Sequence, residues 1–181
     1  MNRKHWAPVF LCLVMLAAGA GAASAGTESF NGVAFGTPAG ELKSFLKLKS
    51  NGPIDYYVNL NESYEIPGFP NPIVFYGFVD GKLYAAYVRL DSANAYAALK
   101  KSLTGKYGKP KIKQDGEIVV NRWTTGDVTI KLKADMQNAV MRLAYYYEPA
   151  IKDRNILSEQ LDTGMNFKDL MQEWQRQGLK K

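Results

Sequence analysis

Cysteine and histidine are almost absent from this sequence of 181 residues, which contains one of each. Cys12 and His5 both lie within the first 25 residues. That segment has a basic start, a short apolar run and the small residues Ala-Ser-Ala at its end, a pattern typical of a secretory signal peptide. We expect cleavage before Gly26, which leaves a mature chain with neither cysteine nor histidine.

These missing residue types exclude several classes of chemistry. Without histidine or cysteine, the mature chain cannot assemble a Ser-His-Asp triad, a Cys-His pair, a zinc site with nitrogen or sulfur ligands, or a covalently attached haem. The sequence also lacks a phosphate-binding P-loop and a Gly-x-Gly-x-x-Gly dinucleotide motif. We therefore expect no cofactor, no bound metal ion and no enzymatic activity.

Long apolar runs are missing after residue 25, and no cysteine stands at the cleavage point to carry a lipid. A membrane-spanning helix needs about 20 apolar residues, so we expect no stable membrane insertion once the leader is removed. An uncleaved N-terminal anchor is the alternative interpretation. Because no disulfide can form, the mature chain must be stable through packing and hydrogen bonding alone. These features indicate a periplasmic or secreted bacterial protein.

The charge of the chain is mildly positive. Its 23 basic and 17 acidic residues give a formal net charge of +6, and the loss of Arg3 and Lys4 with the leader lowers this to +4. Such an excess is compatible with an acidic partner or an anionic membrane surface, and it is also common in proteins that bind neither. Because the chain is exported, we expect no nucleic acid partner.

Hydrophobic patterning and turn residues predict an α+β fold. One helix should open at Thr37-Pro38 and run to residue 46, and a second should begin at residue 91 or 92 and end at Gly108. Asp80-Gly81 predicts a tight hairpin turn. Antiparallel strands with helices on one face are the expected architecture. The predicted strands cover residues 30–35, 54–60, 73–79, 83–90, 117–123, 127–134 and 139–147.

The order of these elements suggests a tandem α-β-β-β organisation behind one leading strand. We expect a signal peptide at residues 1–25, an α+β domain at 26–150 and a C-terminal helical extension at 151–181. Within that extension, an amphipathic helix is predicted behind Asn166 by the apolar stripe of Phe167, Leu170, Met171 and Trp174. The helix either docks on the sheet of its own domain or is free to engage a partner or a membrane surface.

Three segments carry a resemblance to known proteins. The helix entry at residues 33–37, the hairpin at 80–83 and the helix exit at 106–110 resemble those of small uncharacterised bacterial envelope proteins. More distantly, the order of elements over roughly residues 30–147 is similar to the SmpA/OmlA outer-membrane assembly lipoproteins and to the tandem β-lactamase inhibitor proteins. The resemblance implies a helix-plus-antiparallel-sheet unit. This chain departs from the lipoproteins because it lacks a cysteine to carry lipid.

The candidate binding residues lie on the last two predicted strands. Alternation places the apolar residues of strand 127–134 on one face and Lys131 and Lys133 on the other. On strand 139–147, Arg142 and Tyr146 share a face. We expect Lys131, Lys133, Arg142 and Tyr146 to form an exposed basic, aromatic surface of the kind favoured at interfaces. The alternative interpretation is that the C-terminal helix covers this face.

Two other groups of charged residues require interpretation. A cluster of lysines surrounds the end of the second predicted helix: Lys100, Lys101, Lys106, Lys109, Lys111 and Lys113. These lysines could neutralise phosphates or lipid headgroups, but we favour the interpretation that they form a solvated helix face. The carboxylates with enzymatic potential are Glu62, Glu65, Asp115 and Glu117, which a glycosidase would need as a pair across a cleft.

The sequence therefore favours a non-enzymatic binding or interaction protein with an envelope protein as its partner. A carboxylate-dependent enzyme acting on an envelope glycan and an inhibitor of a secreted hydrolase are the two alternatives. The oligomeric state is left open.

Overall fold

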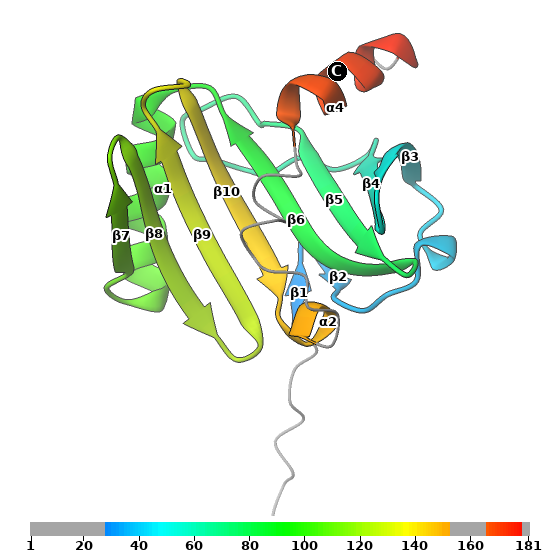
Figure 1. Ribbon diagram of the computed structural model, residues 1–181, viewed down its shortest axis with the longest axis horizontal. Helices are drawn as coiled ribbons and strands as arrows, with labels where there is room; N and C mark the ends of the chain where they lie inside the picture. The colour runs from blue at the N-terminus through cyan, green and yellow to red at the C-terminus, as the bar shows by residue number, and fades with distance from the viewer. Residues whose placement is uncertain (1–27, 153–165, 179–181) are drawn as a thin grey trace, which may run out of the picture.

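The computed structural model describes residues 28–152 and 166–178. The predicted leader, with Cys12 and His5, lies outside the described residues. Eight antiparallel strands form one sheet in the order β3-β4-β5-β6-β10-β9-β8-β7 (Figure 1). Their bounds are β3 Phe45–Asn51, β4 Ile54–Asn59, β5 Val74–Val79, β6 Lys82–Leu90, β7 Lys111–Asp115, β8 Ile118–Thr125, β9 Val128–Asp135 and β10 Val140–Tyr147.

The sheet consists of two four-stranded halves that are joined edge to edge. Strands β3 to β6 follow one another as hairpins, and so do β7 to β10. The last strands of the two halves, β6 and β10, pair antiparallel at the centre, with Arg142 opposite Arg89. Helix α1 (Ala93–Tyr107) connects the halves. The described part of the chain is mostly β, so the expected α+β class holds only in outline.

Local signals place α1 where the sequence predicted it. The Ser92 hydroxyl accepts a hydrogen bond from the Ala95 N–H at 3.1 Å and so satisfies one of the first donors of the helix. At the other end, Gly108 adopts φ 82°, a left-handed conformation that favours glycine, and its N–H donates to the Thr104 carbonyl. Leu99 and Leu103 are buried against the sheet. The Asp80-Gly81 hairpin between β5 and β6 is also confirmed, with positive φ at both residues.

The predicted helix at residues 37–46 is wrong. A single 3-10 turn, η1 (Ala39–Glu41), replaces it, and the chain then extends into the edge strand β3. Gly40 weakens any helix here, and pairing with β4 places the Phe45 ring 4.7 Å from the ring of Tyr76. Burial in the sheet therefore overrides the Thr-Pro capping signal.

The leading strand is also corrected, because Asn31-Gly32 turns it into a short hairpin of β1 (Ser29–Phe30) and β2 (Val33–Ala34).

Strand β7 was absent from the sequence prediction. Its five residues, Lys-Ile-Lys-Gln-Asp, are all exposed, and they pair with β8 in continuous register from Lys111 opposite Arg122 to Asp115 opposite Ile118. A strand at the edge of a sheet buries little side-chain surface, so its apolar signal is weak. Each half consequently contributes four strands rather than the three expected.

The two faces of the sheet carry separate hydrophobic cores. Helix α1 and the β1-β2 hairpin cover one face, where the buried residues include Tyr76, Ile130, Leu132 and Leu143. The opposite face is covered in part by α2 (Pro149–Lys152) and α4 (Phe167–Arg176) (Figure 1). The expectation of helices on one face alone is therefore corrected, because α4 lies on the face opposite α1.

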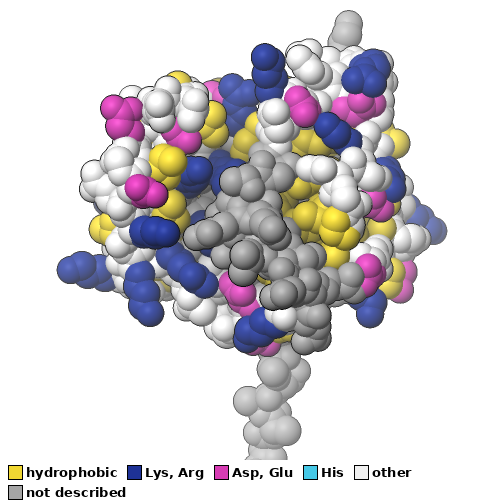
Figure 2. Space-filling view, in the orientation of Figure 1, with side chains coloured by type: hydrophobic (Ala, Val, Ile, Leu, Met, Phe, Trp, Pro, Cys, Tyr) yellow, Lys and Arg dark blue, Asp and Glu magenta, His cyan; other side chains and the backbone are white. Residues whose placement is uncertain are grey.

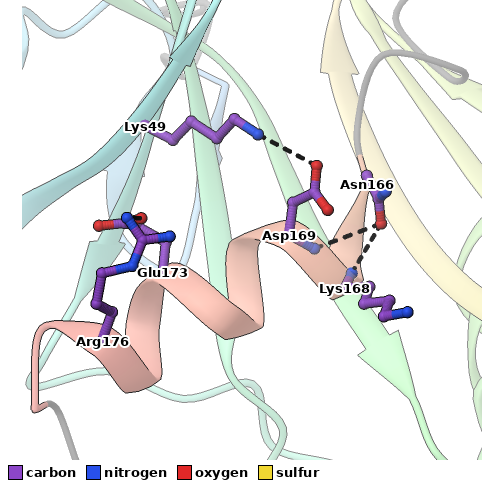
Figure 3. A network of polar contacts seen from close by, with 6 residues as sticks. All are labelled: Lys49, Asn166, Lys168, Asp169, Glu173 and Arg176. Atoms are coloured by element: carbon purple, nitrogen blue, oxygen red, sulfur yellow. Dashed lines mark hydrogen bonds and ion pairs between the residues drawn. The ribbon is translucent and has the colours of Figure 1, made fainter.

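Helix α4 docks on the sheet of its own domain. Asn166 caps it by accepting hydrogen bonds from the N–H groups of Lys168 and Asp169, as Figure 3 shows. The Phe167 ring lies 5.8 Å from that of Phe75, and Leu170 and Trp174 are buried. Across the exposed side, Lys49 Nζ contacts the Asp169 carboxylate at 3.2 Å. Of the two interpretations of the predicted amphipathic helix, the structure has the docked one.

Candidate binding site

Strand register gathers six basic residues of strands β7 to β10 on the face opposite α1. Directly paired residues in an antiparallel sheet point to the same side. One row across strands β7 to β10 contains Lys111, Arg122 and Lys131. The next row contains Lys113, Lys133 and Arg142, and it continues to Arg89 on β6. We call this surface the basic face; its residues are Lys111, Lys113, Arg122, Lys131, Lys133 and Arg142. It covers the half of the sheet from β7 to β10, beside the half on which α4 docks.

Exposure on the basic face falls from the edge of the sheet toward its centre. Lys111 and Lys113 on β7 are exposed, and the Arg122 side chain is 46% exposed. Lys133 is intermediate, whereas Lys131 and Arg142 are only 8% and 5% exposed. Figure 2 shows Lys and Arg side chains gathered over the β7 and β8 end of this face. The accessible positive charge therefore lies at the edge.

The sequence prediction for this surface is confirmed in part and corrected in part. The structure places Lys131, Lys133, Arg142 and Tyr146 on one face, with Lys133 directly opposite Arg142. Tyr146, however, is 1% exposed and belongs to the second hydrophobic core, as do Ile151 of α2 and Leu170 of α4. The centre of this face is therefore not open to solvent. The expected exposed surface is wrong for Lys131, Arg142 and Tyr146.

Buried tyrosines hold the inner end of the basic face in place. The Lys131 ammonium lies 4.9 Å from the centroid of the Tyr146 ring, a cation–π contact. The ring of Tyr146 in turn meets that of Tyr87 edge-on at 5.6 Å. Burial raises the pKa of Tyr56 to about 12, and the positive charge of Arg142 opposes that rise. The inner cations are therefore packed against a rigid aromatic layer.

Carboxylates partly balance the charge. Arg122 is held by Thr129 Oγ1 at 3.2 Å and by the Glu148 carboxylate at 3.5 Å. Lys133 Nζ lies 3.9 Å from Asp135. Hydrogen bonds from Asn138, with smaller contributions from Lys133 and Arg142, lower the pKa of Asp135, so this carboxylate stays ionised. Among the described residues, the basic face still carries an excess of positive charge.

The basic residues at the β7 and β8 edge of this face are not identified as a site by the sequence. The sequence analysis places Lys111 and Lys113 in a lysine cluster on a helix face, and it gives Arg122 no role. The alternation of Lys111, Ile112 and Lys113 has the period of a strand, and this signal could have placed the two lysines on one side of a sheet edge.

The four carboxylates proposed for catalysis do not meet in the cavity that the structure contains. Glu62 accepts a hydrogen bond from the Tyr76 hydroxyl at 2.8 Å, and Glu65, Asp115 and Glu117 are exposed. A cavity of about 540 Å³ has Asp91 as the single carboxylate among its described lining residues. No group of three or more potential ligands able to hold a metal ion occurs within residues 28–152 and 166–178. In the same two ranges, each helix is too short or too polar to cross a membrane.

Family models, curated protein sequences and solved structures were all compared with the chain, and none of them matches it.

Proposed function

We propose that this chain is an exported, non-enzymatic binding protein of the bacterial envelope, periplasmic or secreted, and that it holds an acidic surface of a partner protein on its basic face. The observation that carries the proposal is the strand register that aligns six basic residues in two rows. The signal-like leader supports export. The resemblance to small envelope proteins agrees with this location.

The geometry of the basic face suits a rigid charged platform. Neighbouring strands lie about 4.8 Å apart and alternate residues along a strand about 7 Å apart, so the two rows cover roughly 14 Å by 7 Å. The exposed cations of β7 and β8 lie where carboxylates of a partner can reach them, and the packed inner cations add to the local potential. Such a field speeds encounter with an acidic surface and selects against basic ones.

The test compares two variants with the same change in net charge. The first reverses the exposed edge with Lys111→Glu, Lys113→Glu and Arg122→Glu. The matched control reverses three exposed lysines elsewhere, Lys43→Glu, Lys82→Glu and Lys101→Glu. Tagged mature protein and both variants are used to capture partners from envelope extract at low and at moderate salt.

We expect one partner to be retained by the wild type and by the control and to be lost from the edge variant, with weaker capture at higher salt. If the edge variant retains the partner as well as the wild type does, the basic face is not the binding site. If all three proteins capture nothing, the proposed interaction is absent from the extract and the proposal fails.

The tandem construction of the sheet favours one second function, an inhibitor of a secreted hydrolase. This idea depends on the two four-stranded halves and on the resemblance to tandem inhibitor proteins. It predicts that the captured partner is a hydrolase and that adding the purified chain lowers its activity. An envelope-glycan hydrolase is the weaker alternative, because Glu62, Glu65, Asp115 and Glu117 do not line the described cavity.

A further inference from the structure

A cavity of about 540 Å³ lies where five parts of the chain meet. These are the connection between β4 and β5, the start of β5, the end of β6, the start of α1 and one residue of α4. Its volume is within the range of about 300–1,000 Å³ that is typical of small-molecule sites. Most of the wall is apolar, with Ile66, Phe69, Ile73, Phe75, Leu90 and Met171 as its largest apolar contributors.

The wall of the cavity combines residues of the packed cores with one adaptable residue of α4. Ile66, Phe75 and Leu90 are each at most 3% exposed, so they belong to the packed cores on either side of the sheet. Met171, in contrast, is partly buried and comes from the docked helix. An unbranched thioether side chain changes shape easily and can follow the contour of a flexible apolar ligand.

Among the described residues that line the cavity, one is a cation. This residue is Arg89, and its Nε lies 3.0 Å from Asp91 Oδ1. The two side chains are 49% and 78% exposed, so the pair is well solvated and contributes little stability. Arginine has five N–H donors, and the contact with Asp91 involves Nε. Ser92, also in the wall, already uses its hydroxyl to cap α1.

We propose that this cavity binds a small amphipathic carboxylate, a single aliphatic chain with one anionic end. The chain lies against Phe69, Ile73 and Met171, the partly exposed apolar residues of the wall, and the carboxylate receives two parallel hydrogen bonds from the Arg89 guanidinium. A singly charged head is favoured because Asp91 stands beside Arg89 and repels a doubly charged phosphate. Arg89 lies directly opposite Arg142 of the basic face, but none of the described residues that line the cavity comes from β7 to β10. The test of this site requires no partner protein.

The experiment measures binding of dodecanoate, below its micelle concentration, to the mature protein by isothermal titration calorimetry. We expect one-to-one binding. Dodecanol, which has the same chain without the charge, should bind about tenfold more weakly, because a hydrogen bond to a charged group contributes about 1.5 kcal/mol or more.

Two variants and a control locate the site. Arg89→Gln should weaken dodecanoate binding about tenfold, as the loss of one charge-assisted contact predicts. Ile73→Trp should weaken binding by narrowing the cavity, and its thermal midpoint and circular dichroism show whether it remains folded. The matched control is Arg176→Gln on the exposed end of α4, where the arginine pairs with Glu173 outside the cavity; it should bind within twofold of the wild type.

Three results would overturn this assignment. The first is the absence of saturable one-to-one binding to the wild type. The second is an Arg89→Gln variant that binds dodecanoate as tightly as the Arg176→Gln control. The third is binding only to vesicles of anionic phospholipid and not to monomeric dodecanoate, which would identify a membrane surface in place of a free amphipathic ligand.

Discussion

Replacing Tyr146 with alanine is expected to lower the free energy of unfolding by about 4 kcal/mol. The side chain is 1% exposed on β10, within the second core. Its ring packs edge-on against Tyr87 with centroids 5.6 Å apart, and Lys131 lies over it at 4.9 Å. The change removes a buried aromatic ring, leaves a cavity and takes away the packing partner of a nearly buried ammonium group.

The assay is urea-induced unfolding of the mature protein followed by circular dichroism, with the thermal midpoint as a second measure. For a domain of about 150 residues, each kcal/mol shifts the midpoint by about 2–4 °C, so we expect a fall of roughly 8–16 °C. Tyr146→Phe keeps the ring and should cost no more than about 1.5 kcal/mol.

Val140→Ala provides the matched control. Val140 is on the same strand and the same face but is 37% exposed, and its replacement should change stability by at most about 0.5 kcal/mol. A loss of less than 1 kcal/mol for Tyr146→Ala would refute the reasoning. It would mean that the centre of this face is open in solution and that the original expectation of an exposed Tyr146 was right.

Three further predictions concern α4, the sheet and acid stability. Leu170→Ala should destabilise the protein by about 2–5 kcal/mol and increase proteolysis of the C-terminal segment, because this residue of α4 is only 2% exposed. Unchanged proteolysis would argue against docking of α4 on the sheet. Gly77→Ala places a Cβ 2.8 Å from the Tyr84 ring and should lower the urea midpoint, whereas a neutral result would mean that the ring moves aside at little cost. Asp135 has a lowered pKa because of its hydrogen bonds from Asn138, so it stabilises the fold above its ordinary pKa, and this contribution is lost as the pH falls below about 4. Asp135→Asn should therefore flatten the acid limb of a stability-against-pH profile, and an unchanged limb would contradict the assignment.

Elements with strong local signals could be predicted from the sequence. The turn at Asp80-Gly81 requires positive φ, which these two residues tolerate, and that requirement does not depend on the rest of the fold. In the same way, Ser92 and Gly108 set the ends of α1 through caps that span only a few residues. The stripe behind Asn166 predicted α4 because an amphipathic helix repeats within a single segment.

Elements whose conformation depends on distant partners could not be predicted in this way. Residues 37–46 carry a helix-capping signal, yet Phe45 gains more by packing against Tyr76, which is 31 positions later in the chain. The sequence of β7 has no pattern of buried apolar residues, because all five of its side chains are exposed. The strand forms because its backbone pairs with β8. Local propensity is a weak influence that tertiary contacts override in both cases.

The sequence by itself determined the alternation that places Lys131 and Lys133 on one side of β9, because side chains along a strand must point to opposite faces. Only the tertiary structure decided that Lys111 and Arg122 lie in one row with Lys131 and that the centre of the face is covered. Alternation divides the residues of a strand into two sets, but it carries no information about what later packs on each. That choice depends on which apolar side chains come together in the folded chain, and Tyr146 shares its buried cluster with side chains of α2 and α4.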